Sequence, residues 1–271
     1  MSMSSDKSEH AWPCRNGDLG LTGWSGQLGP MDLSDPSWTR VEAYGGQWIT
    51  SPVIDAENNV FVHSSNGWCD VVNIDGSRQP LRLHLNGVTK ATPALMGKML
   101  YAATRDGYAL AVDTTTGQEL WRTKYAENCC EDSCCVAATA DTLLLAGRAE
   151  VPTEADFLNT HVFALNTATQ VTKWCFKPSL PTVNFMPSMV QGKVLFQDMG
   201  GAVYCLQHSD GSVCWQEPNN RRFRLTSQGG AAVGGGLIFA SSNTKERDAR
   251  RGMLAAYDVD TGKRQWTLTF Q

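Results

Sequence analysis

The chain has 271 residues, of which 42% are hydrophobic and 18% charged, and its net charge is −4. The apolar fraction predicts a globular protein, and the length suits one large all-β domain. The small net charge excludes a general attraction to nucleic acid or to an anionic membrane surface.

The polar first eleven residues predict a disordered tail, followed by a folded domain over residues 12–271. The tail lacks the apolar run of a secretory signal, and no segment approaches the roughly 20 apolar residues of a membrane span. Nine cysteines without a signal are expected to be reduced thiols in the cytoplasm. An exported protein whose leader had been removed would show the same features.

Five windows of thirteen residues align without gaps, at positions 68–80, 109–121, 162–174, 203–215 and 254–266. Four of them end in tryptophan, namely Trp121, Trp174, Trp215 and Trp266. The ninth place holds Gly76, Gly117, Gly211 and Gly262, and it holds Gln170 in the third window. A polar residue four positions before this glycine is typical of a hairpin turn, because its side chain bonds nearby N–H groups and glycine adopts positive φ.

An apolar segment precedes each window, and a shorter segment precedes that one. Three short segments contain Pro52, Pro93 or Pro187, which fits the edge of a sheet because proline has no N–H for the ladder. The pattern predicts five four-stranded units at roughly residues 49–87, 88–130, 131–178, 179–220 and 221–271. Each tryptophan is expected on the outermost strand, largely buried against the neighbouring unit.

The segment from Tyr101 to Trp121 resembles the PQQ-enzyme repeat, in which an Asp-Gly turn, an Ala-x-Asp-x-x-Thr-Gly turn and a tryptophan follow one another. Residues 254–266 repeat its second half, and residues 12–18 resemble the lead-in of such propellers. Over residues 12–271 the chain is similar to the quinoprotein alcohol dehydrogenase-like family of β-propellers. The resemblance implies more than five blades, commonly seven or eight, and the family contains both quinone-dependent dehydrogenases and non-enzymatic scaffolds.

Residues 37–44 resemble the outermost strand of an additional blade, because the residues around Trp38 are similar to those around Trp121. Together with the blade number that the family implies, this predicts an incomplete arc of a larger propeller. The missing strands are expected in a longer parent chain or in a partner subunit. An arc exposes apolar faces and strand edges, which favours association, including self-association.

Cys129 and Cys130 are the strongest indication of an enzyme. Quinoprotein dehydrogenases similar to this chain hold a disulfide between adjacent cysteines against the quinone, at this place in a repeat. The resemblance therefore implies an alternative function, a dehydrogenase or a fragment of one that uses pyrroloquinoline quinone (PQQ) with calcium. The segment after Cys130 departs from the family pattern, and no Glu, Asn and Asp can be assigned as calcium ligands.

Three residues separate Cys129 and Cys130 from a second pair, Cys134 and Cys135. The thiolates of this cluster are possible ligands for a soft metal. Adjacent strand residues point to opposite faces, so Cys134 and Cys135 do not converge on one ion. Ordinary thiols are the favoured interpretation, and no metal or other cofactor is predicted. Cys205 and Cys214 flank the fourth hairpin turn, where small apolar packing is favoured over a facing pair.

The sequence shows no phosphate-binding loop, nucleophile elbow or acid–base pair, which favours a non-catalytic scaffold. Two insertions, near residues 148–160 and 243–252, and the connectors between units are expected on one face. The fifth-unit side of that face is basic and supplies the partner-binding candidates Arg221, Arg222, Arg224, Lys245, Arg247, Arg250 and Arg251. The predicted function is a scaffold that binds a protein partner or a small ligand, and not nucleic acid, through this face.

Overall fold

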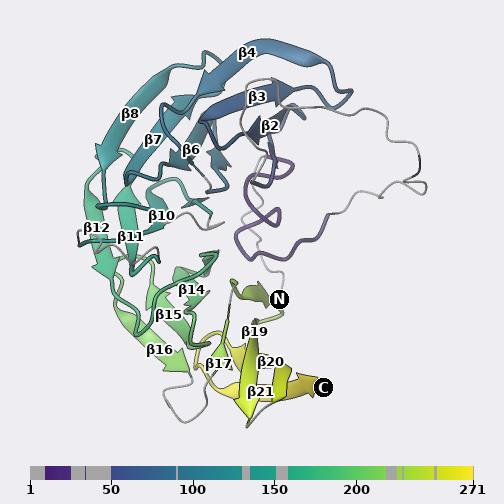
Figure 1. Ribbon diagram of the computed structural model, residues 1–271, viewed down its shortest axis with the longest axis vertical. Helices are drawn as coiled ribbons and strands as arrows, with labels where there is room; N and C mark the ends of the chain where they lie inside the picture. The colour runs from purple at the N-terminus through teal and green to yellow at the C-terminus, as the bar shows by residue number, and fades with distance from the viewer. Residues whose placement is uncertain are drawn as a thin grey trace.

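The computed structural model describes residues 10–25, 34, 50–89, 91–129, 135–150, 158–217, 225–227, 229–246 and 249–270. These residues form five antiparallel sheets that stand side by side in an arc (Figure 1). The sheets are the blades of a β-propeller, which confirms the predicted fold. The arc is not closed, and the first and fifth blades form its ends (Figure 1). The described part of the chain contains no helix long and apolar enough to cross a membrane.

Consecutive strands build each blade from the concave side of the arc to its outer wall (Figure 1). The first blade contains β1 (Val53–Ile54), β2 (Val60–His63), β3 (Trp68–Val72) and β4 (Arg78–His84). The second contains β5 (Ala94–Met96), β6 (Met99–Ala103), β7 (Tyr108–Asp113) and β8 (Glu119–Lys124). The third contains β9 (Ala137–Ala138), β10 (Thr142–Gly147), β11 (His161–Asn166) and β12 (Thr172–Phe176). The fourth contains β13 (Ser188–Val190), β14 (Lys193–Gln197), β15 (Val203–Gln207) and β16 (Val213–Glu217). The fifth contains β18 (Ala232–Gly234), β19 (Leu237–Glu246), β20 (Ala249–Asp258) and β21 (Arg264–Phe270), with β17 (Leu225–Thr226) added beside β19.

The inner strands β1, β5 and β13 begin immediately after Pro52, Pro93 and Pro187. Because proline lacks an N–H, its place before the strand leaves the ladder complete. The core lies between blades, and its largest cluster of buried side chains runs from Tyr101 in the second blade through Leu144 to Phe196 in the fourth. The blades are therefore held to one another by apolar contact as well as by the covalent chain.

The tryptophans occupy one equivalent position in four blades. Trp121, Trp174, Trp215 and Trp266 lie opposite Ala111, Ala164, Cys205 and Ala256, each next to a β-bulge. In the first blade Arg82 takes this place, opposite Asp70. Its Nε donates to Asp70 Oδ1 at 2.8 Å, and its guanidinium carbon lies 4.2 Å from the centre of the Trp68 ring. An ion pair between a partly buried arginine and a buried carboxylate thus replaces the indole and the small residue of the other blades.

Two tryptophans are covered by the turn of the following blade. The indole N–H of Trp174 donates to the main-chain oxygen of His208 at 2.9 Å, and that of Trp215 donates to Val259 at 2.9 Å. Gly211 and Gly262 follow these acceptors at positive φ and lie against the two rings. Trp174 is consequently only 7% exposed.

The expectation that Trp121, Trp215 and Trp266 are all largely buried is wrong. Trp121 and Trp215 are only partly buried, and Trp266 is 37% exposed. Trp266 is open because its blade ends the arc, and no following turn among the described residues covers it. The position is equivalent in the four blades, whereas its burial depends on the neighbouring blade.

Residues 12–20 lie on the concave side of the arc (Figure 1) and connect its blades. Trp12 pairs with Ile54 in β1. The main-chain oxygens of Pro13, Leu19 and Gly20 accept hydrogen bonds from the inner strands β5, β13 and β18 at 2.7, 2.7 and 2.8 Å. One segment therefore ties together the inner strands of four blades. Residues 37–44, predicted as an extra outer strand, lie outside the described residues.

Candidate interaction surface

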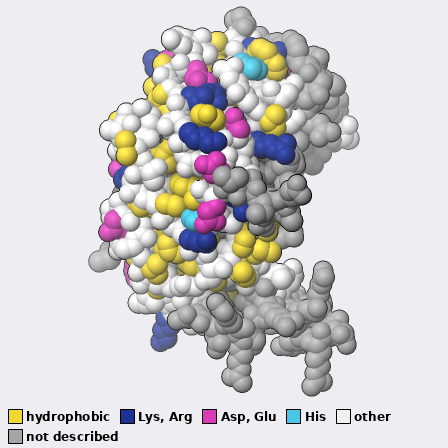
Figure 2. Space-filling model, turned by 60° about the vertical axis from the view of Figure 1, so that its left-hand side comes forward, with side chains coloured by type: hydrophobic (Ala, Val, Ile, Leu, Met, Phe, Trp, Pro, Cys, Tyr) yellow, Lys and Arg dark blue, Asp and Glu magenta, His cyan; other side chains and the backbone are white. Residues whose placement is uncertain are grey.

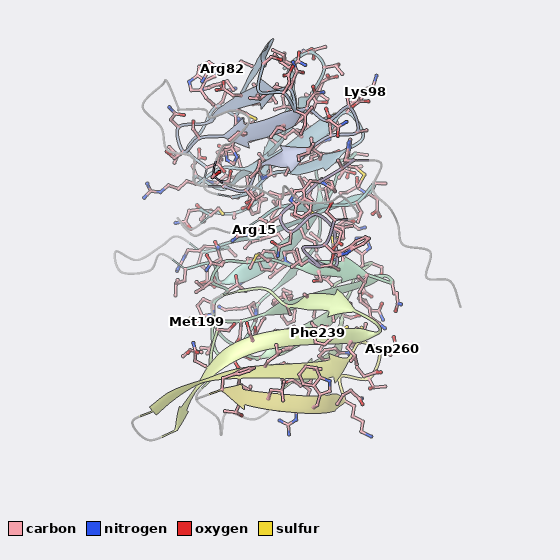
Figure 3. The ribbon with its side chains drawn as sticks, turned by 90° about the vertical axis from the view of Figure 1, so that its right-hand side faces the viewer. Arg15, Arg82, Lys98, Met199, Phe239 and Asp260 are labelled. Carbon is pink, nitrogen blue, oxygen red and sulfur yellow. The ribbon has the colours of Figure 1, made fainter. Side chains whose placement is uncertain are left out.

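The connections between second and third strands and the connectors between blades lie on one face, here called the loop face. The N–H of Tyr125, after the second blade, donates to Gly107 in that blade's turn at 3.0 Å. Similarly, the N–H of Ser227, between β17 and β18, donates to the main-chain oxygen of Met199 in the fourth blade at 2.9 Å. Figure 3 shows Met199 on this side of the molecule, and Lys98 and Asp260, from turns of the opposite face, on the other side.

Three of the seven basic residues predicted to bind a partner belong to strands of the fifth blade that the structure describes. Lys245 is in β19, and Arg250 and Arg251 are in β20, where the structure describes their backbone only. The other four, Arg221, Arg222, Arg224 and Arg247, lie outside the described residues. The seven residues therefore remain predicted partner-binding residues.

The insertion in the fifth blade was expected to be a loop. The structure shows instead that it extends the central hairpin of the blade. β19 and β20 have ten residues each and pair continuously from Leu237 with Asp258 to Glu246 with Ala249. Figure 3 shows these long strands projecting beyond the other blades on the side of Met199. Antiparallel pairing satisfies the backbone groups of the insertion, which accounts for its regular structure.

An open hollow of about 500 Å³ lies at the root of this hairpin. Ser227, Ser242 and Asn243 contribute polar groups to its lining, and Met253 and Phe270 contribute apolar ones. Hydroxyl and amide groups beside apolar side chains suit a polypeptide segment, whose main chain needs hydrogen-bond partners and whose side chains need apolar contact.

The open end of the arc presents an apolar strand. Trp266, Leu268 and Phe270 alternate along β21 and therefore point to the same face of the sheet. They are 37%, 52% and 54% exposed. The Trp266 ring contacts Phe239 at a centroid distance of 5.9 Å, and no acceptor for its indole N–H is found among the described residues. These three side chains are called the apolar ladder below.

The structure describes one of the two candidate cysteines, Cys129, and its side chain is buried. Cys129 is 4% exposed and lies in the connector after β8, where its N–H donates to the main-chain oxygen of Arg105 at 2.9 Å. Cys130 lies outside the described residues. Across the described ranges, no three His, Cys, Asp or Glu side chains gather as ligands of a metal ion. The described residues therefore do not fit a PQQ–calcium site.

Two buried ionisable side chains hold the loop face in place. Asp198 accepts hydrogen bonds from the N–H groups of Gly200 and Ala202 in its own turn and from that of Leu180 in the connector after the third blade. The Tyr204 hydroxyl also donates to Asp198 at 2.9 Å, and burial raises the pKa of the carboxyl. His63 Nδ1 lies 2.9 Å from Thr50 Oγ1, and burial lowers the pKa of His63 to about 4. His63 is consequently neutral at neutral pH. Asp198 stabilises its own turn, whereas His63 contacts Thr50 ahead of β1.

The outer wall of the arc carries charges of both signs. Figure 2 looks onto this wall and shows basic and acidic side chains interspersed with scattered apolar ones. Four of the charges form two ion pairs, Lys173 with Asp141 at 2.9 Å and Arg122 with Glu119 at 2.7 Å. Mixed charges of this kind are typical of a solvated surface and favour no particular ligand.

A protein-family model described as outer membrane protein assembly factor BamB matches residues 76–271. The chain belongs to this family of PQQ-repeat propellers. The match begins at the turn of the first blade and spans the second to fifth blades. The repeat windows of the sequence predicted the same fold, a PQQ-repeat β-propeller, that membership in the BamB family implies.

Solved structures extend the comparison with the BamB family. BamB from Moraxella catarrhalis is similar at a TM-score of 0.56 and 15% identity, over 85% of this chain and 78% of that one. Quinohemoprotein alcohol dehydrogenase from Comamonas testosteroni is similar at a TM-score of 0.66 and 15% identity, over 96% of this chain and 49% of that one. The chain thus spans about half the dehydrogenase, and likeness at this identity shows the fold alone. No curated protein matches the sequence.

Proposed function

We propose that this member of the BamB family is a non-catalytic scaffold that binds a protein partner at the open end of its fifth blade. The observation that carries the proposal is the uncovered apolar ladder of Trp266, Leu268 and Phe270. Contiguous exposed apolar side chains favour protein association. The family description, an assembly factor, agrees with a protein-binding role.

The covered tryptophans indicate what the partner presents. Trp174 and Trp215 each receive a hairpin turn that offers a main-chain oxygen to the indole N–H and a glycine to the ring. Trp266 has the same position opposite a small residue, Ala256, and it lacks such a turn among the described residues. We infer that a separate protein chain supplies a β-hairpin turn of this chemistry to Trp266.

The extended β19–β20 hairpin enlarges the proposed surface. Phe270 belongs to the apolar ladder and also borders the hollow at the root of the hairpin, so the two features are continuous. The seven basic candidates belong to the same blade and its connector. A partner with acidic residues beside its hairpin turn would complement them, and its association would weaken as salt is raised.

A peptide that carries the chain's own fifth-blade turn provides a direct test. Unlabelled cyclic peptide with the sequence of residues 255–265 is titrated into the ¹⁵N-labelled full chain, and the indole N–H resonances are followed. The Trp266 indole resonance is expected to shift with saturable dependence, while that of the covered Trp174 stays in place. Trp266→Ala should abolish saturable binding, whereas Leu120→Ala, which alters an exposed apolar residue of β8, should leave it unchanged.

Two results would overturn this assignment. Peptide binding that survives Trp266→Ala would remove the apolar ladder as the docking surface. Sedimentation that shows the chain associating with itself through Trp266 would make a second copy the partner in place of a separate protein.

The non-catalytic part of the proposal rests on the buried Cys129 and on the absence of a metal-ligand cluster among the described residues. Purified protein is expected neither to bind PQQ nor to oxidise alcohols with it when calcium is added. Equilibrium dialysis measures the binding directly. Stoichiometric, calcium-dependent binding that is lost on changing Cys129 and Cys130 to Ser would replace the scaffold with a dehydrogenase.

A further inference from the structure

The outer hairpin of the fourth blade brings two cysteines together. Cys205 in β15 lies opposite Trp215 in β16, and Cys214 occupies the β-bulge next to Trp215. The bulge places two residues of one strand against a single residue of the other, so Cys214 and Trp215 both adjoin Cys205. Burial raises the pKa of Cys205 to about 12, and the Cys214 thiol, which adjoins it at the bulge, adds to this effect.

The pair has one accessible and one protected member. Cys214 is exposed, whereas Cys205 is buried. The Lys193 ammonium at the start of β14 interacts electrostatically with both sulfurs and pairs with Asp260 from the next blade.

We propose that Cys205 and Cys214 are a thiol modification site, at which a low-molecular-weight disulfide such as oxidised glutathione forms a bond between the two sulfurs. The proposal is independent of the partner surface on the fifth blade. Cys214 is exposed and therefore reacts with the reagent first. Cys205 is buried beside it and then attacks the mixed disulfide that forms on Cys214.

The exchange balances in two steps. The Cys214 thiolate, after losing its proton to solvent, attacks one sulfur of the reagent, and the other sulfur leaves as a thiolate that takes up a proton. Cys205 then loses its proton and attacks the Cys214 sulfur, which releases the second thiolate of the reagent. The two protein thiols are oxidised by two electrons, and one reagent disulfide is reduced to two thiols. Proximity of Cys205 favours this second step over a stable mixed disulfide.

The new bond would lie between two blade junctions. The turn that it closes contains His208 and Gly211, which cover Trp174 in the third blade. On the other side, the Cys205 sulfur is 4.0 Å from the main-chain oxygen of Val259, the acceptor for Trp215. Formation of the disulfide should therefore change the fluorescence of the adjacent Trp215 and raise the melting temperature of the protein.

The chain contains a matched control thiol. Cys175 is exposed on β12, the equivalent outer strand of the third blade, and its partner across the strands is Phe163. Without a cysteine opposite it, Cys175 should stop at the mixed disulfide with the reagent. Both exposed cysteines lie on an outer strand beside its tryptophan, Cys175 after Trp174 and Cys214 before Trp215, and only Cys214 has a cysteine on the facing strand.

The test treats the reduced full chain with oxidised glutathione, blocks remaining thiols with N-ethylmaleimide and maps the peptides without reduction. Cys205 and Cys214 are expected in one linked pair, with at least tenfold less glutathione on Cys214 than on Cys175. In a Cys205→Ser variant, Cys214 should carry glutathione as Cys175 does, and circular dichroism checks that the variant is folded. Equal glutathione on Cys214 and Cys175 in the unaltered protein, or a linked pair that forms only in denaturant, would overturn the proposal.

Discussion

A Cβ atom placed on Gly211 would lie 2.7 Å from the ring of Trp174, although the two residues belong to different blades. Gly192 offers a matched comparison, because it has nearly the same φ, +71° against +72°, with open space around its Cβ position. Gly211→Ala is expected to cost about 2–4 kcal/mol of unfolding free energy, of which overpacking contributes about 1–3. Gly192→Ala should cost about 1 kcal/mol, the conformational part alone. Equal losses in urea titrations of the two variants would refute the proposed contact.

Trp174 and Trp266 occupy equivalent positions, but a turn of the next blade covers only Trp174. Truncating each side chain therefore separates the contribution of the position from that of the junction between blades. Trp174→Ala is expected to destabilise the protein by about 3–5 kcal/mol, as for other large-to-small changes in a core. Trp266→Ala should lose about 1–2 kcal/mol, because part of its ring is in water already. Thermal and chemical unfolding measure both losses. The reverse order would mean that the last blade, and not the junction, limits stability.

The first blade allows a double-mutant test of its ion pair. Asp70→Ala leaves the partly buried Arg82 without its carboxylate and is expected to cost about 2–4 kcal/mol. Adding Arg82→Trp to Asp70→Ala recreates the Ala–Trp pairing of the second, third and fifth blades and should recover most of the loss. The coupling energy from the four unfolding free energies checks this. Additive losses would show that the two places are not structurally equivalent.

The buried His63 predicts a dependence of stability on acid. Its pKa is about 4 in the folded protein and about 6.5 when unfolded, so the unfolded chain takes up a proton first as the pH falls. Between pH 6.5 and 4.5 the unfolding free energy should therefore decrease, by at most about 1.4 kcal/mol per pH unit from this group. His63→Gln should flatten the profile in that window, whereas His84→Gln, near the surface, serves as the control. Parallel profiles for the two variants would show that His63 does not titrate in this way.

The blades were predictable because their signals are local. Each turn glycine and each outer tryptophan reports on one hairpin, and Gln170, at φ 59° in the glycine position, shows that the turn shape persists without glycine. The Arg82–Asp70 pair was missed because the gapless window ended at Pro80, and additional residues in β4 move the equivalent position beyond it. Asp70, at a place where other blades have alanine or cysteine, was the available signal.

The candidate site depended on relationships that a single sequence does not display. Trp266 carries the same local pattern as Trp174, and its exposure follows from the missing neighbour and not from its own hairpin. The insertion after Asn243 was expected as a loop, because charged residues there resemble a solvated connection. The inserted residues instead continue the register of the β19–β20 hairpin, so their backbone groups pair across it. This register is not visible in the charge pattern of the sequence.

The segment on the concave side of the arc also orders the events of folding. Gly20 accepts a hydrogen bond from the Ser188 hydroxyl across 168 residues of sequence, while each blade pairs strands that are near neighbours in the chain. Contacts of such long range form slowly, because a large loop must close before they become favourable. During synthesis the blades can form in sequence as the chain emerges, but residues 12–20 must wait for the fourth and fifth. The first residues of the domain are thus expected among the last to reach their native contacts.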